Sequence, residues 1–209
     1  MRTRLGATGR DVELVAVTKG FPAAAVTAAV AAGCERIGEN YAQELLAKSD
    51  AVDGAVPRRP AVHFIGRLQS NKVRQLASVV DVWESIDRPA LVREVAKRAA
   101  GATVLSQVNA TGEPDKGGCP LADVAGLVDA AATAGLDVDG LMTVGPTDGD
   151  LTATADAFRS VRRATDDLGL ATCSMGMSGD LDIALDCGTT RVRVGTALFG
   201  FRNPQDSIG

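Results

Sequence analysis

Short apolar runs alternate with longer, partly polar stretches along almost the whole chain. The first run, residues 12–20, reads VELVAVTKG and carries Glu13 as its only charge before Lys19. Such a run is typical of a strand buried on both faces, as in a parallel sheet. Further strands are expected at residues 35–38, 63–66, 79–86, 103–109, 138–144, 171–175 and 191–195.

The stretches between these runs predict helices. Pro22 begins an alanine-rich stretch that ends at Gly33, and a helix commonly has proline in its first turn and glycine after its last. Leu91, Val92 and Val95 recur at helical spacing within residues 89–100. Other helices are expected at residues 41–48, 72–78, 121–134, 151–168 and 180–186, and loops at residues 49–60 and 112–120.

This alternation of strands and helices predicts a (β/α)₈ TIM barrel. Every connection is long enough for a right-handed parallel crossover. A doubly wound open sheet is the alternative, but the dinucleotide fingerprint expected after its first strand is missing. Because too few residues follow Gly200 to build a second domain, we expect residues 1–209 to form a single domain with a short C-terminal tail.

The composition excludes several classes of partner. A net charge of −4 with no Lys/Arg cluster argues against nucleic acid. The longest small-apolar run, residues 22–32, is too short to span a bilayer, and the N-terminus lacks a signal-peptide pattern. Four scattered cysteines and one histidine fit no metal site, so we expect a metal-free protein of the reducing cytoplasm.

Lys19 is the first candidate for chemistry, because it stands at the C-terminal end of a predicted barrel strand. Binding and catalytic groups gather at that edge of parallel α/β folds. A lysine partly withdrawn from water loses stability in its charged form, and the neutral amine can attack an aldehyde. Pyridoxal phosphate or a sugar carbonyl would supply such a group. The alternative is that Lys19 merely ends a strand with its ammonium in water.

The loops after strands seven and eight are candidates for binding phosphate, as in many barrels. They read SMGMSGD and RVRVGTALFG. Gly176, Gly179 and Gly195 would let backbone amides approach an anion, and Ser178 and Thr196 would add hydroxyl donors.

The same glycines can instead simply turn the chain, with Asp180 and Asp182 in the first turn of a helix. We expect both carboxylates to point away from a bound phosphate, because like charges repel. Strand one neighbours strand eight in a closed barrel, so Lys19 would face both loops. This combination favours a phosphate site.

Five blocks of sequence resemble the pyridoxal-phosphate homeostasis protein family, in the family's order, over residues 12–200. They are LVAVTK, IGENYAQE, HFIGRLQSNK, SMGMSGD and RVGTALFG. The resemblance implies a barrel like the N-terminal, cofactor-binding domain of alanine racemase, with pyridoxal phosphate held as an aldimine on Lys19. It also implies phosphate contacts at Ser178, Gly195 and Thr196, with Asn40 and Arg193 near the cofactor.

Three features depart from the family pattern. Only eleven residues precede Val12, so the usual N-terminal helix is expected to be shortened or lost. Arg67 stands where the family usually has proline, and Gly20 replaces a bulkier polar residue. These changes leave cofactor binding in place and affect the mouth of the barrel.

Arg193 has two candidate roles near the cofactor. A guanidinium facing the pyridine nitrogen would make the ring a weaker electron sink, whereas one facing the phosphate would serve retention. A structural ion pair is the third reading. We expect His63 to be structural, Tyr41 to pack rather than to donate a proton, and Trp83 to fill the core.

The resemblance implies a protein that binds pyridoxal phosphate and takes part in its intracellular homeostasis, with no catalytic residue and no evident turnover. Its partners would be the cofactor and apo-enzymes that receive it, and we expect a monomer. The alternative is a fold-type-III enzyme, an amino-acid racemase or decarboxylase, but such enzymes add a C-terminal β domain. A lysine aldolase without cofactor would explain Lys19 and the phosphate loops, but not the resemblance.

Overall fold

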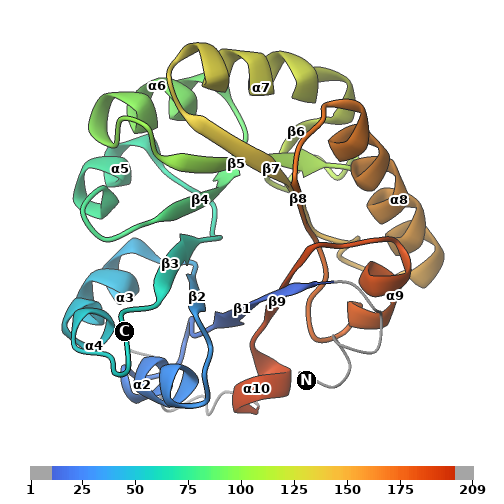
Figure 1. Ribbon diagram of the computed structural model, residues 1–209. Helices are drawn as coiled ribbons and strands as arrows, with labels where there is room; N and C mark the ends of the chain where they lie inside the picture. Colours follow the sequence, from blue (N-terminus) through green and yellow to red (C-terminus); the bar gives the residue numbers. More distant parts are fainter. Residues whose placement is uncertain (1–10, 201–209) are drawn as a thin grey trace.

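A ring of parallel strands surrounded by helices forms the part of the chain that the computed structural model describes, residues 11–200 (Figure 1). Its strands are β1 Glu13–Val17, β2 Arg36–Glu39, β3 Ala61–Phe64, β4 Val82–Ile86, β5 Thr103–Asn109, β7 Asp137–Thr143, β8 Thr172–Ser174 and β9 Arg191–Val194. Strand β1 pairs in parallel with both β2 and β9, and β4 with both β3 and β5, so the sheet closes on itself. The predicted (β/α)₈ barrel is confirmed, and the open sheet is wrong.

The helices lie outside the ring, at the positions expected from periodicity. They are α2 Ala24–Ala31, α3 Ala42–Ala47, α5 Ser70–Leu76, α6 Pro89–Arg98, α7 Val124–Thr133, α8 Leu151–Asp167 and α9 Leu181–Asp186. Helix α8 shows why such a segment forms a helix. The Asp150 carboxylate accepts hydrogen bonds from the amides of Thr152 and Ala153 in the first turn. Ala157, Phe158 and Val161 form its buried face.

Four short elements were not expected. Helix α4, Ser49–Asp53, lies in the predicted loop at residues 49–60, and helix α10, Thr196–Phe199, follows β9. Strand β6, Cys119–Pro120, extends the sheet beside β5 and leads into the 3₁₀ turn η1, Leu121–Asp123. Each is too short for periodicity to reveal.

Two strand boundaries also differ from the prediction. The fourth strand begins at Val82 rather than at residue 79, because Val79 N and Val80 N both still donate to Leu76 O at the end of α5. The third begins at Ala61, because Ala61 N donates to Glu35 O and so starts the pairing with β2.

The core lies between the barrel wall and the helices. Trp83 is completely buried there, as expected, and its ring packs 6.3 Å from that of Phe64. Cys34, Cys119, Cys173 and Cys187 form no disulfide with one another. Across residues 11–200, the structure contains no helix long and apolar enough to span a membrane.

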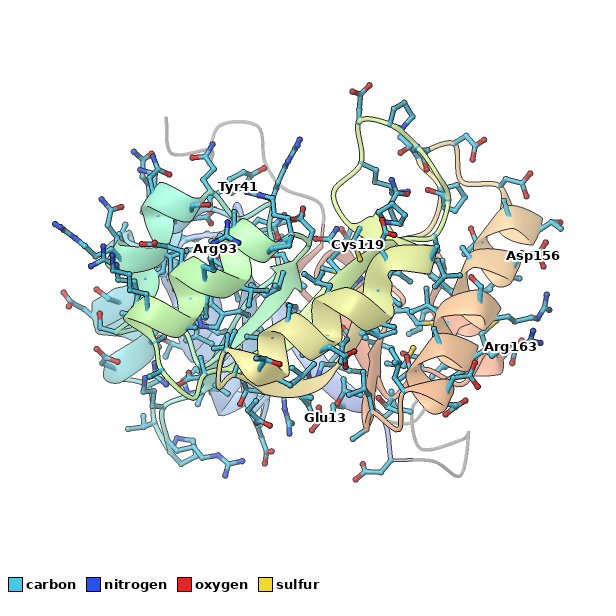
Figure 2. All side chains as sticks on the ribbon, turned by 90° about the horizontal axis from the view of Figure 1, so that it is seen from above. Glu13, Tyr41, Arg93, Cys119, Asp156 and Arg163 are labelled. Carbon is cyan, nitrogen blue, oxygen red and sulfur yellow. The ribbon has the colours of Figure 1, made fainter. Side chains whose placement is uncertain are left out.

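The two ends of the barrel differ in character. Figure 2 shows Tyr41, which follows β2, at one end and Glu13, at the start of β1, at the other. Because the strands are parallel, all their C-terminal ends lie at the end marked by Tyr41. The candidate residues that follow strands are therefore gathered on this one rim.

Candidate functional site

Lys19 is half-buried on the C-terminal rim, two residues beyond the end of β1. The last pairing with β2 is made by Thr18 N, which donates to Gly38 O at 3.0 Å. Phe21 N then donates to Thr18 O at 3.1 Å and closes a turn around Lys19. The lysine therefore stands at a defined point of the rim, partly withdrawn from water.

The two predicted phosphate loops meet beside this turn. The ring of Phe21 packs 5.2 Å from that of Phe199 in α10, so the turn of Lys19 touches the loop after β9. Ala197 N donates to Ser178 Oγ at 3.2 Å, which joins the loop after β8 to the loop after β9. The structure thus brings Lys19, Ser178, Gly195 and Thr196 to one part of the rim, and the two hydroxyl residues are exposed there.

The glycines of these loops serve different purposes. Gly176 has a φ of +98°, which favours glycine. A side chain on Gly195 would begin 3.1 Å from Val17 O, so this glycine packs closely against β1 and leaves little room for a larger residue. A side chain on Gly179 would meet no atom within 4 Å, so open space lies beside that backbone.

Asp180 is bound within its own loop. One oxygen of its carboxylate accepts from Met177 N at 2.6 Å, and the other lies next to Gly145, 3.2 Å from the point where a side chain would begin there. Asp182 is exposed on α9. That these carboxylates point away from a phosphate stays a prediction.

Arg193 lies inside the barrel, below the rim. It is 4% exposed, and its Nη1 and Nη2 donate at 2.7 Å to Ser174 Oγ and Thr143 O. Burial lowers the pKa of the guanidinium, while the negative charge of Glu84 opposes this shift. The backbone of Arg193 contacts the first predicted phosphate loop, since Arg193 N donates to Gly176 O at 2.9 Å, whereas the side-chain hydrogen bonds of Arg193 go to Ser174 and Thr143.

Glu84 is the centre of the polar network that holds Arg193. Ser174 Oγ donates to Glu84 Oε2 at 2.6 Å, and His63 Nδ1 lies 2.6 Å from Glu84 Oε1. Complete burial raises the pKa of Glu84, but the hydrogen bond and charge of His63 and the charges of Arg193 and Arg191 together lower it to about 2. His63 is buried in this network, which agrees with a structural role.

Asn40 directly follows β2, the strand that neighbours β1, and it lines a hollow on the same rim as Lys19. Its Oδ1 is buried and has no hydrogen-bond partner among the described residues. A side chain on Gly66 would begin 2.0 Å from Asn40 O, so only glycine allows this close contact. An unpaired buried oxygen costs free energy, and a donor from a ligand would satisfy it.

The hollow has a volume of about 1060 Å³ and opens over the ends of β2, β3, β4 and β5. Its lining includes Asn40, Tyr41, Arg67, Lys72 and Arg88. Tyr41 is 58% exposed there, so the expectation that it packs in the interior is wrong. It is the N-cap residue of α3 and makes no side-chain capping hydrogen bond there.

Sequence reasoning missed two sets of residues around this site. The first is the Glu84 network, whose only signal was a glutamate within the apolar strand VWESI. The second consists of Glu39, Glu44 and Lys48, which bind the chain on both sides of Lys19. Its signal was the Glu44–Lys48 pair at helical i,i+4 spacing.

The polar groups on the rim suit the binding of a phosphorylated aldehyde. Lys19 supplies an amine, Ser178 and Thr196 supply hydroxyls, and Asn40 supplies an acceptor without a partner. Across residues 11–200 there is no group of His, Cys, Asp and Glu side chains that could hold a metal ion.

Comparison with known proteins identifies the family. The alanine racemase N-terminal domain family matches residues 1–203. A curated relative, the pyridoxal phosphate homeostasis protein of Pseudomonas aeruginosa, is 41% identical over 213 residues, which cover 97% of this chain and 91% of that protein. The chain belongs to the pyridoxal phosphate homeostasis protein family. The resemblance carried by the five sequence blocks is therefore confirmed.

Solved structures show the same barrel as this chain. PipY of Synechococcus elongatus, in a structure without PLP, has a TM-score of 0.84 at 32% identity and covers 95% of this chain and 96% of its own. Its structure described as having PLP bound has a TM-score of 0.78. Alanine racemase of Streptomyces coelicolor, 23% identical with a TM-score of 0.74, shows the shared fold alone.

Two departures from the pattern of the homeostasis family have a visible setting. Arg67 is exposed and lines the hollow. Gly20 has a φ of +70°, which a glycine tolerates without strain, and its N–H donates to Glu44. The expected shortening of the N-terminal helix concerns residues that lie outside those described.

Proposed function

We propose that this protein binds pyridoxal phosphate reversibly through Lys19 and takes part in the homeostasis of this cofactor in the cytoplasm. The observation that carries the proposal is the half-buried Lys19 beside the two loops that present Ser178 and Thr196. The curated relatives named for this role, and the PipY structure described with PLP, support it. Four cysteines that form no disulfide with one another suit a reducing compartment.

In this proposal each rim residue has one task. Ser178, Gly195 and Thr196 bind the phosphate, and Asn40 accepts a hydrogen bond that no described residue supplies. When bound, the cofactor supplies an aldehyde to the amine of Lys19 and a ring that can withdraw electrons. Lys19 must lose its proton before it can attack, because only the neutral amine is a nucleophile.

We assign Arg193 to the ring of the cofactor rather than to its phosphate. Both terminal nitrogens of Arg193 are bound inside the barrel, to Ser174 and Thr143. A guanidinium near the pyridine nitrogen disfavours protonation of that nitrogen, because both groups would be positive. The ring then withdraws electrons weakly, which supports binding without turnover.

We further propose that the protein is a single domain that works as a monomer, delivers the cofactor to apo-enzymes and has no catalytic cycle of its own. The enzymatic alternative, an amino-acid racemase or decarboxylase, is tested directly. Purified protein with bound cofactor is incubated with L-alanine while the optical rotation is followed. An unchanged rotation is the expected result, and racemisation above the rate of free pyridoxal phosphate would favour the enzyme.

The central test traps the cofactor on the protein. Treatment with borohydride should fix pyridoxal phosphate on Lys19, because reduction converts the reversible link into a stable amine. Peptide mapping by mass spectrometry locates the label. The Lys19→Ala variant should take up no label, whereas a label on Lys72 or Lys116 would contradict the assignment.

A further inference from the structure

Lys48 is a buried cation beside the end of β1. Its side chain is 3% exposed, and Nζ donates to Thr18 O and Glu39 Oε1, both at 2.7 Å, and to Glu44 Oε1. An ammonium has three N–H donors, so these bonds use all of them. The side chain of Lys48 is therefore held in place by Thr18, Glu39 and Glu44.

The same cluster binds the chain immediately before and after Lys19. On one side, Thr18 Oγ1 donates to Glu39 Oε1 at 2.6 Å. On the other side, Gly20 N donates to Glu44 Oε1. Glu39 is completely buried and Glu44 is 14% exposed, so water competes weakly for these bonds.

The cluster of Glu39, Glu44 and Lys48 lies at the point where backbone pairing between β1 and β2 ends. Thr18 N makes the last backbone bond between β1 and β2, and Lys19 lies beyond it in a turn. Without further support the strand end would fray, because terminal residues of an element have the fewest backbone bonds. Three side chains provide that support. Glu39 is the last residue of β2, Glu44 lies in α3, and Lys48 is the C-cap residue of α3.

We propose that Lys48, together with Glu39 and Glu44, is a set of positioning residues that fixes the turn of Lys19, so that its amine meets the cofactor in one orientation. The proposal rests on the function proposed for Lys19. A reactive group held in place loses less entropy when it reacts, so a fixed turn speeds the formation of the covalent link. The two lysines thus have separate roles in this proposal, because Lys48 fixes the turn and Lys19 reacts with the cofactor.

The competing explanation is that the cluster only stabilises the fold. In that case its variants would lower stability and leave the reactivity of Lys19 unchanged in molecules that are folded. Glu44 separates the two explanations, because Glu44→Gln retains an oxygen that can accept from Gly20 N and Lys48, whereas Glu44→Ala removes it. In both variants Lys48 retains its bond to Glu39.

A matched control lies at the other end of the barrel. Arg59 pairs with Asp53 and Asp81 near the starts of β3 and β4. The Arg59→Met variant breaks a charged network far from Lys19. It therefore measures what a general loss of stability does to the reaction.

Two measurements are made on each variant after circular dichroism has shown that it is folded. Hydrogen exchange of the Gly20 amide, without cofactor, reports directly on the turn. The rate of covalent attachment of pyridoxal phosphate, stopped with borohydride, reports on Lys19. In Glu44→Ala we expect exchange at least about tenfold faster and attachment about tenfold slower, as for loss of one bond to a charged group. Glu44→Gln should stay within about threefold of the wild type, since an uncharged acceptor remains.

The outcomes separate this proposal from the function on which it rests. Wild-type attachment rates in folded Glu44→Ala, or an equal slowing in Arg59→Met, would overturn the positioning role alone. A wild-type protein that traps no label on Lys19 would overturn the proposed function and this role with it. If Glu44→Ala does not fold, Thr18→Val replaces it, because it removes only the bond to Glu39 and should slow attachment by about threefold.

Discussion

Arg193 shows how the neighbours of one residue bear on its role. The sequence left open whether it binds the phosphate, faces the ring or forms a structural ion pair, and the positions of its nitrogens bear on this question. In the structure they are bound to Ser174 Oγ and Thr143 O inside the barrel. Glu84, 4.0 Å from Nη1, supplies the nearest negative charge. No sequence pattern reveals this set, because its members are distant along the chain and meet only when the barrel closes.

We predict that Arg193→Gln changes the electronic state of the bound cofactor more than its retention. Loss of the guanidinium removes the positive charge that disfavours protonation of the ring nitrogen. The visible absorption of the bound cofactor and its pH dependence should therefore shift, while the affinity for pyridoxal phosphate stays within about tenfold. Absorption spectra over a pH series test this. A large loss of affinity with an unchanged spectrum would instead assign Arg193 to the phosphate.

At the scale of elements, the loops after β8 and β9 should act as one phosphate site. Thr196→Ala removes a single hydroxyl and should weaken binding of pyridoxal phosphate modestly, by about 1 kcal/mol. Gly195→Val should cost more, because a side chain there begins 3.1 Å from Val17 O and displaces the loop. Titration with unphosphorylated pyridoxal provides the control. Equal affinity of the wild type for the two compounds would show that these loops do not bind phosphate.

The elements themselves could largely be read from the sequence, since each long helix and each barrel strand carries its own periodicity. Local pattern fails for α4, β6 and α10, which are shorter than the window that periodicity needs. Local pattern also identifies Lys19 as a lysine at the end of a strand, but it does not reveal the cluster of Glu39, Glu44 and Lys48 around it. Lys48 and Glu44 are visible as a helical pair, whereas their contacts with Thr18 and Gly20 depend on how α3 packs beside β1.

At the scale of the whole molecule, we predict a monomer. Among the described residues the large exposed hydrophobic side chains are Tyr41, Val56, Leu121, Leu151 and Met177, which lie in separate segments of the chain. Stable interfaces are usually built around a larger continuous apolar area. Light scattering at micromolar concentration should give the mass of one chain. A stable dimer or tetramer would contradict this prediction.

The interior of the barrel should make the protein sensitive to acid. The pKa of Glu84 is lowered to about 2 in the folded state, against 4.5 for the unperturbed group. Because the folded pKa is depressed, its stabilising effect is fully present above pH 4.5 and is lost as the pH falls toward 2. For this completely buried group the loss is on the order of 3 kcal/mol.

Two glutamate variants test this prediction by urea unfolding between pH 7 and pH 2. Glu84→Gln leaves Arg193 and His63 without their carboxylate, so it should be least stable relative to the wild type near neutral pH, by roughly 3–5 kcal/mol. The difference should shrink as the pH falls from 4.5 toward 2, because Glu84 then takes up a proton in the unfolded wild type but not in the folded protein, which lowers wild-type stability. Glu113→Gln is the control. The pKa of Glu113 is also about 2, owing first to its hydrogen bond from Lys116, but the group faces solvent, where screening weakens such pairs. Its substitution should change the pH profile far less, and an equal effect of the two variants would show that the buried network does not set the acid limit of this barrel.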